Sequence, residues 1–125
     1  MKLTIPGEFP SLNQYIDAER SCWQAAATMK KNCTDSVAWL ASTKKPIETY
    51  PVRVSFHWYV KNRKIDLDGI AGFGTKALLD GMTKGGLIAG DSLKYVQGLV
   101  HTVSVDKENP RVEITLEGME DELDH

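Results

Sequence analysis

The segment 52–60 alternates between two kinds of side chain more regularly than any other part of the chain. The first kind is apolar and occupies Val52, Val54, Phe56, Trp58 and Val60, while Arg53, Ser55, His57 and Tyr59 lie between them. Side chains in a β-strand point to opposite faces in turn, so residues two apart share a face. The segment is therefore expected to be a strand that packs one face against the core.

Weaker patterns predict the other elements. Residues 14 to about 40 contain no Pro or Gly and are rich in alanine, which favours a helix with a break near residues 32–35. A second helix is expected over about 70–82. Short apolar or alternating segments predict strands at 2–5, 95–105 and about 112–116. Ser11 or Asn13 is a candidate cap for the first helix. His57 is expected on a strand face. The core is expected to hold Trp23, Trp39 and Trp58, with stacking on nucleic-acid bases as the alternative.

Composition limits the class of protein. The chain has 125 residues, 42% of them hydrophobic and 26% charged, which is typical of one ordinary domain. No apolar run approaches the roughly 20 residues of a membrane span, and a signal-peptide pattern is absent. The cysteines, Cys22 and Cys33, and the histidines are not spaced as zinc ligands. We therefore expect a reduced, cytoplasmic protein that does not enter the membrane.

Charge is distributed unevenly, although the net charge is only -2. Five acids fall in the last nine residues, which leaves 12 acids against all 15 Lys and Arg in residues 1–116, a net charge of +3. This body is expected to form one domain, and residues 117–125 a frayed acidic tail. A mildly basic body permits binding to nucleic acid. The tail acids are Glu117, Glu120, Asp121, Glu122 and Asp124.

Four aspartates lie between residues 64 and 91, with Lys76 among them, and suggest a site. Asp66 and Asp68 occupy alternate positions, so in an extended segment both would face one cavity while Leu67 turned toward the core. Oxygen ligands suit Mg²⁺, which binds proteins through one or two carboxylates and substrate phosphates. Asp91 could complete the group. The pattern therefore points to phosphate chemistry.

Each of these residues also has a simpler interpretation. Asp68 could cap the following helix, and Asp91 could be a turn residue after Gly90. Lys76 and Asp80 are four residues apart and would share a helix face, where an exposed ion pair is the more common outcome. As a functional residue, Lys76 would instead contact a phosphate.

Two neighbouring features also have more than one interpretation. The glycines of residues 69–76 imitate phosphate-binding loops, but Thr75 and Lys76 stand in the reverse of the Walker order and no buried strand precedes them. The segment does not open a βαβ unit as a dinucleotide fingerprint must. The basic run of Lys61, Arg63 and Lys64 is either a solvated edge or a contact to a phosphodiester backbone.

Taken in order along the chain, these motifs resemble the RusA family of Holliday junction resolvases. The N-terminal part of the resemblance is Ile5-Pro6 through Phe9-Pro10-Ser11-Leu12-Asn13-Gln14-Tyr15. The basic-Asp-x-Asp element is Lys64-Ile65-Asp66-Leu67-Asp68, and the Lys-x-x-x-Asp helix runs from Lys76 to Asp80 and on to Lys84. The last acidic element is Gly90-Asp91-Ser92. The combination covers most of the chain.

The resemblance implies a two-layer α/β domain of the α+β type, with helices packed on a small mixed sheet. It also implies a Mg²⁺-dependent (or Mn²⁺-dependent) endodeoxyribonuclease that resolves four-way DNA junctions as a homodimer, in recombination and repair. Its catalytic residues would be Asp66, Asp68, Lys76 and Asp91. The metal ligands would be Asp66, Asp68 and Asp91, with Asp80 as a further ligand or a support for Lys76. Contacts to DNA would come from Lys61, Arg63, Lys64, Lys76 and Lys84.

Three departures from the family pattern leave alternatives open. Gly69 replaces the usual Asn, and Gly90 replaces the first acid of an Asp pair. The gap from Asp68 to Lys76 is about one helical turn longer than in the shortest-spaced members of the family. The sequence therefore allows nicking of flaps or forks instead of junctions. It also allows a phage accessory protein that binds DNA without cutting it.

Overall fold

The computed structural model describes residues 1–9, 12–21, 23–121 and 123. Several expectations fall outside this part of the chain or on side chains that are not described in it. They concern Ser11 and Asn13 as caps, the thiol of Cys22, the packing of Trp23, and the tail residues Glu122 and Asp124.

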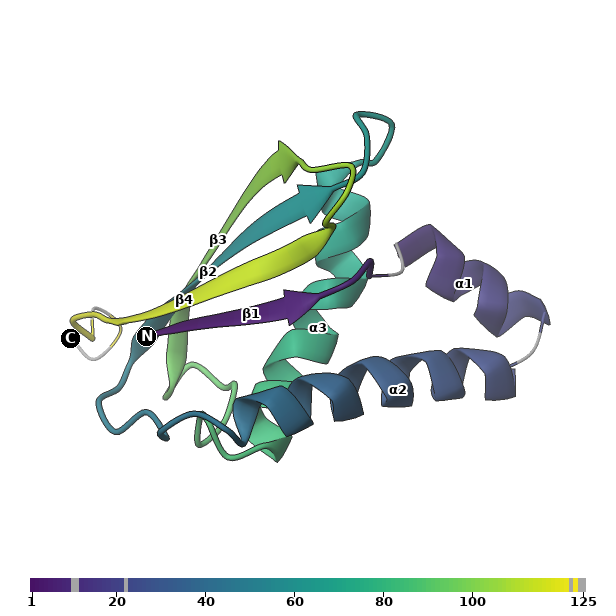
Figure 1. Cartoon of the computed structure of the whole chain (residues 1–125). Coiled ribbons are helices and arrows are strands. Elements are labelled where there is room, and N and C mark those ends of the chain that lie inside the picture. The colour runs from purple at the N-terminus through teal and green to yellow at the C-terminus, as the bar shows by residue number, and fades with distance from the viewer. Residues whose placement is uncertain (10–11, 22, 122, 124–125) are drawn as a thin grey trace.

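A four-stranded mixed sheet forms one layer of the molecule and three helices form the other (Figure 1). The strand order is β1-β4-β2-β3, in which β4 is antiparallel to both of its neighbours and β2 is parallel to β3. This arrangement confirms the expected fold class. The strands are β1 (Lys2–Pro6), β2 (Val52–Val60), β3 (Val96–Val105) and β4 (Arg111–Gly118). The helices are α1 (Leu12–Ser21), α2 (Trp23–Ala41) and α3 (Leu67–Lys84).

Strand β2 lies between two other strands and carries the centre of the core. Its alternate residues are buried in the order that the sequence predicts, and the largest of them are Phe56 and Trp58. Buried apolar residues from β1 and β4, including Leu3 and Ile114, continue this surface across the sheet. The apolar face of the sheet is therefore covered by the helix layer, while the opposite face carries polar side chains.

Helix α3 packs closely against the sheet and against α2 because small residues lie at these contacts. Gly74 lies against the Trp58 ring, and Gly81 lies against Val37 of α2, so a Cβ at either position would overlap its neighbour. The glycines of segment 69–76 thus lie inside a helix and form no phosphate loop. This confirms the interpretation that neither phosphate-binding motif is present.

Parallel strands cannot be joined by a tight turn, and α3 is the crossover between β2 and β3. The loop 61–66 and the start of α3 therefore lie at the carboxyl end of β2, next to the start of β4. Open α/β sheets commonly place their binding sites at such strand ends. Within the described residues, no helix combines the length and hydropathy that crossing a bilayer requires.

Three expectations about local structure were wrong. The predicted break near residues 32–35 is absent, because α2 is continuous from Trp23 to Ala41. Trp39 is 69% exposed on α2, although tryptophan was expected in the core. Strand β4 continues to Gly118, and its residue Glu117 pairs with Arg53, so the tail begins later than residue 117.

Candidate functional site

A pocket of about 460 Å³ opens at the carboxyl end of β2. Its walls come from the turn after β1, the loop 61–66, the first turn of α3 and the beginning of β4. Charged residues of both signs line it, and the apolar ring of Trp58 also contributes to the wall. The charged lining residues are Glu8, Lys61, Lys64, Asp66, Asp68 and Arg111.

Asp66 and Asp68 both line this pocket, but not for the reason that the alternation suggested. Asp66 is the N-cap of α3, with extended backbone angles, and Asp68 already lies in the first helical turn. The pair therefore spans a helix start and not a strand. Leu67 between them is half-buried and packs against the core, as expected.

The two carboxylates are exposed, and in the described part of the chain no ion pair or hydrogen bond engages either of them. Asp66 makes no side-chain capping bond, although its position would allow one. A helix N-terminus also favours negative charge through its aligned backbone dipoles. Both groups are therefore available to a ligand that enters the pocket.

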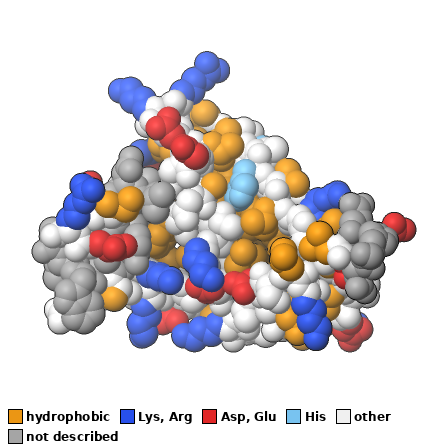
Figure 2. Space-filling model, turned by 180° about the vertical axis from the view of Figure 1, so that it is seen from behind, with side chains coloured by type: hydrophobic (Ala, Val, Ile, Leu, Met, Phe, Trp, Pro, Cys, Tyr) orange, Lys and Arg blue, Asp and Glu red, His pale blue; other side chains and the backbone are white. Residues whose placement is uncertain are grey.

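Basic side chains surround the same opening. Lys61 and Lys64 line the pocket, and the exposed Arg63 belongs to the same loop. Figure 2 shows Lys and Arg side chains projecting at the top of the molecule, where this loop lies in Figure 1. Lys61 is paired with Glu8 at 3.5 Å, and both side chains remain about half exposed. The rim thus offers cations to an anionic ligand.

A second charged group, which we call the Lys76 cluster, consists of Lys76, Asp80, Asp91 and Lys30. The Nζ atom of Lys76 lies 3.2 Å from Asp80 Oδ1 and 3.3 Å from Asp91 Oδ2, and Lys30 reaches Asp80 at 4.0 Å. Hydrogen bonds to Asp80 and then Asp91 raise the pKa of the Lys76 amine above its usual 10.5. Lys76 is therefore held as a cation between two carboxylates.

The structure does not bring Asp91 together with the pocket pair into one ligand group. Asp68 and Lys76 are eight residues apart on α3, which is about 12 Å along the helix axis, and Asp91 contacts Lys76. Among the described residues, no three His, Cys, Asp or Glu side chains are grouped closely enough to hold a metal ion. The expected set of Asp66, Asp68 and Asp91 is thus divided between two places.

The pocket pair alone still fits a hard cation. Asp66 and Asp68 supply only oxygen donors, and Mg²⁺ is commonly bound by one or two carboxylates while phosphates and water complete its shell. Neither carboxylate is neutralised by a lysine or arginine of the described chain. The donor chemistry therefore suits Mg²⁺ or Mn²⁺ at the start of α3.

The absence of an acid at position 90 has a visible cause. A Cβ at Gly90 would come within 2.8 Å of two ring carbons of Tyr95. That ring also packs edge-on against Tyr50, with the ring centroids 5.1 Å apart. An aspartate at this position would therefore require the Tyr95 ring to shift.

Lys84, the remaining candidate for DNA contact, lies in the last turn of α3. Its amine is 2.6 Å from Asp35 of α2 and lowers the pKa of that carboxyl through the hydrogen bond. This ion pair joins α2 to α3 at the opposite end of α3 from the pocket. The structure therefore gives Lys84 a contact between helices.

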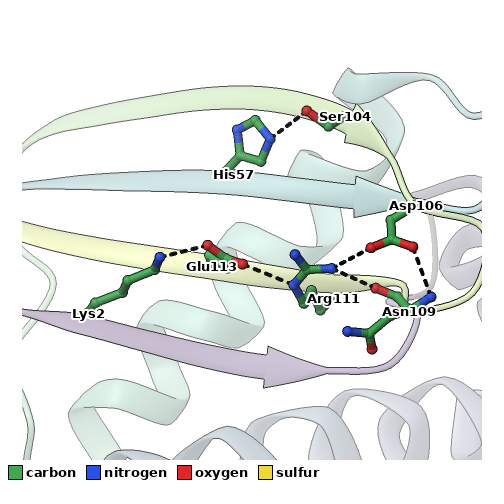
Figure 3. A network of polar contacts seen from close by, with 7 residues as sticks. All are labelled: Lys2, His57, Ser104, Asp106, Asn109, Arg111 and Glu113. Atoms are coloured by element: carbon green, nitrogen blue, oxygen red, sulfur yellow. Dashed lines mark hydrogen bonds and ion pairs between the residues drawn. The ribbon is translucent and has the colours of Figure 1, made fainter.

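Sequence reasoning missed Glu8 and Arg111 as pocket residues. Arg111 begins β4 and is fixed by Asp106 at 2.8 Å and Glu113 at 2.9 Å, while Lys2 holds Glu113 from β1 (Figure 3). Its guanidinium also lies 3.7 Å from the centre of the Tyr59 ring. The Tyr59 contact of Arg111 and the Lys2 contact of Glu113 join β4 to β2 and β1, which are distant in sequence, so no local pattern could have revealed these two contacts.

Comparison with models of known protein families gives no match, and comparison with curated proteins gives none either. The resemblance to the RusA family therefore depends only on the sequence motifs quoted above.

Proposed function

We propose that this protein is a Mg²⁺-dependent endodeoxyribonuclease that cuts four-way DNA junctions by paired nicks. The observation that carries the proposal is the pocket at the start of α3, where Asp66 and Asp68 lie unpaired beside Lys61 and Lys64. Carboxylates beside cations suit a phosphodiester that is brought to a divalent metal ion. The order of motifs that resembles the RusA family supplies the substrate class.

Each part of the pocket has a separate task in this proposal. Lys61, Arg63 and Lys64 would bind backbone phosphates, which positions a strand without reading its sequence. Asp66 and Asp68 would hold the cation at the helix start. A bound Mg²⁺ or Mn²⁺ supplies a nucleophile at neutral pH and stabilises charge on the scissile phosphate.

Lys76 would act on the charge that develops during cleavage. Its side chain is 60% exposed, and Asp80 and Asp91 hold its amine as a cation, so it would meet a phosphate in the charged form. A fixed cation near the scissile phosphate lowers the barrier because negative charge grows there in the transition state. Asp91 is then a positioning residue for Lys76, and its role as a metal ligand requires the loop that carries it to move.

A second candidate is a protein that binds branched DNA without cutting it. The division of the expected ligand set favours this possibility, because Asp91 is bound to Lys76 and no third carboxylate of the described chain is close enough to the pocket pair to share a metal ion with it. Such a protein would still use the basic rim. The two candidates differ only in strand scission.

Cleavage of three labelled DNA substrates tests the proposal: a four-way junction, a flap and a linear duplex of equal length, each with Mg²⁺ or with a chelator. We expect paired nicks in the junction that need the metal ion. The Asp68→Asn protein should bind the junction and leave it intact, while Glu48→Gln, which removes an exposed acid outside the pocket, should cut normally. Binding without nicks by the unaltered protein would support the second candidate.

A further inference from the structure

The connector between α2 and β2 contacts the loop that carries Asp91. This connector is segment 42–51, and the loop, residues 85–95, joins α3 to β3. A backbone hydrogen bond links the two segments, because Ile47 N donates to Leu87 O at 2.8 Å. The position of the loop therefore depends on a part of the chain that lies far from it in sequence.

Tyr50 lies in this connector, and its hydroxyl forms a bridge to the loop. The hydroxyl donates to Ile47 O at 3.0 Å and accepts a hydrogen bond from Ala89 N at 2.9 Å. Both distances are those of ordinary hydrogen bonds, and the donor and an acceptor position of the hydroxyl are both used. Ala89 is two residues before Asp91, so the bridge restrains the backbone close to that carboxylate.

The ring of Tyr50 contacts the same loop through Tyr95. The two rings pack edge-on, with their centroids 5.1 Å apart, and both side chains are half-buried against the core. The Tyr95 ring in turn lies so close to Gly90 that a Cβ there would come within 2.8 Å of it. The two residues before Asp91 are therefore held by a hydroxyl group and by a ring.

Asp91 connects this series of contacts to the Lys76 cluster. Its Oδ2 atom lies 3.3 Å from Lys76 Nζ. This distance is at the long end for a hydrogen bond, so a small shift of the Asp91 backbone would lose the contact. Any group that restrains the loop at Ala89 therefore also determines how Asp91 holds the lysine.

We infer that Tyr50 is a positioning residue that holds Asp91 against Lys76 through its bridge to Ala89 N. Tyr50 does not line the pocket, so it would act only through the loop. An effect on cleavage rests on the proposed function, in which Lys76 is the cation that meets the scissile phosphate. The position of Asp91 does not depend on that function and can be measured without DNA.

Acylation of lysines followed by mass spectrometry measures this position, because only the uncharged amine reacts. Tyr50→Phe removes the bridging hydroxyl and keeps the ring that packs on Tyr95. We expect Lys76 to be acylated at least about twofold faster in this variant, since a weaker contact with Asp91 favours the uncharged amine. Asp91→Asn sets the upper limit of the increase, and Lys107, exposed in the turn between β3 and β4, is the internal reference.

Thr43→Val is the matched control for the lost hydroxyl. Thr43 lies in the same connector, and its hydroxyl also donates to a carbonyl three residues back, Leu40 O at 2.7 Å, but within the described chain it makes no bond to the loop 85–95. Acylation of Lys76 should be unchanged in this variant, and thermal melting should show that each variant is folded. Unchanged acylation of Lys76 in Tyr50→Phe, or an equal increase in Thr43→Val, would overturn the inference.

Single-turnover cleavage of the four-way junction extends the test to the proposed function. Tyr50→Phe should slow cleavage about three- to fivefold, because the lysine would be less well positioned. In the Lys76→Ala background the same change should alter the rate by less than about 1.5-fold, since the group that it positions is gone. Equal slowing in both backgrounds would show that Tyr50 acts through other groups, against the inference. If the unaltered protein cuts no substrate, the proposed function is refuted, and the acylation of Lys76 still decides whether Tyr50 holds Asp91.

Discussion

Two groups of aspartates lie on α3 and its flanks, and they differ in what neutralises them. Asp66 and Asp68 have no cationic partner in the described chain and line a pocket. Asp80 and Asp91 are bound to Lys76. An ion pair keeps a carboxylate ionised but also occupies it, whereas an unpaired carboxylate at a helix start can accept a metal ion. Closeness in sequence therefore does not make these acids one site.

Substitution of the pocket pair gives the largest expected effect. Asp66→Asn with Asp68→Asn should slow junction cleavage at least about 1,000-fold, roughly 4 kcal/mol, because the metal ion would lose its carboxylates. Junction binding should stay equal or become tighter, since repulsion of phosphate falls. Single-turnover cleavage and a binding assay at fixed salt measure the two quantities.

The same variant should remain folded, because asparagine caps a helix about as well as aspartate. Thermal melting checks this point. Cleavage within about threefold of the unaltered protein, less than about 1 kcal/mol in barrier, would remove the pocket from the proposed site.

Lys76→Ala tests whether the lysine acts in catalysis or only in an ion pair. If the amine stabilises the transition state, cleavage should fall about 100-fold. Stability should change by less than about 1 kcal/mol, because all three partners are partly exposed. Lys76→Arg keeps the charge and should recover part of the rate. An unchanged cleavage rate in Lys76→Ala would show that the Lys76 cluster is a surface ion pair.

Asp91→Asn tests whether Asp91 acts only through Lys76 or also binds the metal ion of the pocket pair. If Asp91 only positions Lys76, cleavage should fall about tenfold, since the second partner Asp80 still holds the amine. If Asp91 is a metal ligand, its loss should equal the loss at Asp68. The dependence of the rate on Mg²⁺ concentration distinguishes these outcomes, because only a lost ligand raises the Mg²⁺ concentration that is needed.

Much of the fold could be predicted from sequence because its signals are local. The bounds of β2 follow from strict alternation, and α3 follows from the apolar positions Phe73, Ala77, Leu78 and Leu79, which are all buried. Trp39 was placed wrongly because helical periodicity does not show which face meets the sheet. The break expected near residues 32–35 is absent because packing of α2 on α3 outweighs weak local propensity.

The candidate site was only partly predictable. The aspartates and the basic run are contiguous, so Asp66, Asp68, Lys61 and Lys64 could be named from sequence and do line one pocket. The backbone conformation of the two aspartates could not be predicted, because the same Asp-x-Asp pattern suits a strand or a helix start. The contact of Asp91 with Lys76 depends on where the loop before β3 passes in space, and that of Arg111 with the Tyr59 ring depends on the pairing of β4 with β2.

Removal of the tail gives the smallest expected effect. It tests whether acids outside the pocket affect DNA binding through their charge alone. Truncation after Met119 keeps the pairing of Glu117 and Gly118 with β2 and the bond from Met119 N to Pro51 O. It removes Glu120, Asp121, Glu122 and Asp124. Junction binding should tighten about two- to fivefold at low salt and little at high salt, because distant charges are screened.

The cleavage rate of bound junction should be unchanged in this truncated protein, since none of the removed residues that the structure describes lines the pocket. One exposed hydrogen bond, from Gln97 to Asp121, would be lost, which should cost less than about 1 kcal/mol of stability. The titration of binding against salt and a single-turnover assay measure the two effects separately. A large change in the cleavage rate would mean that acids outside the pocket govern the chemistry, and the contrast between the pocket pair and the Lys76 cluster would then lose its meaning.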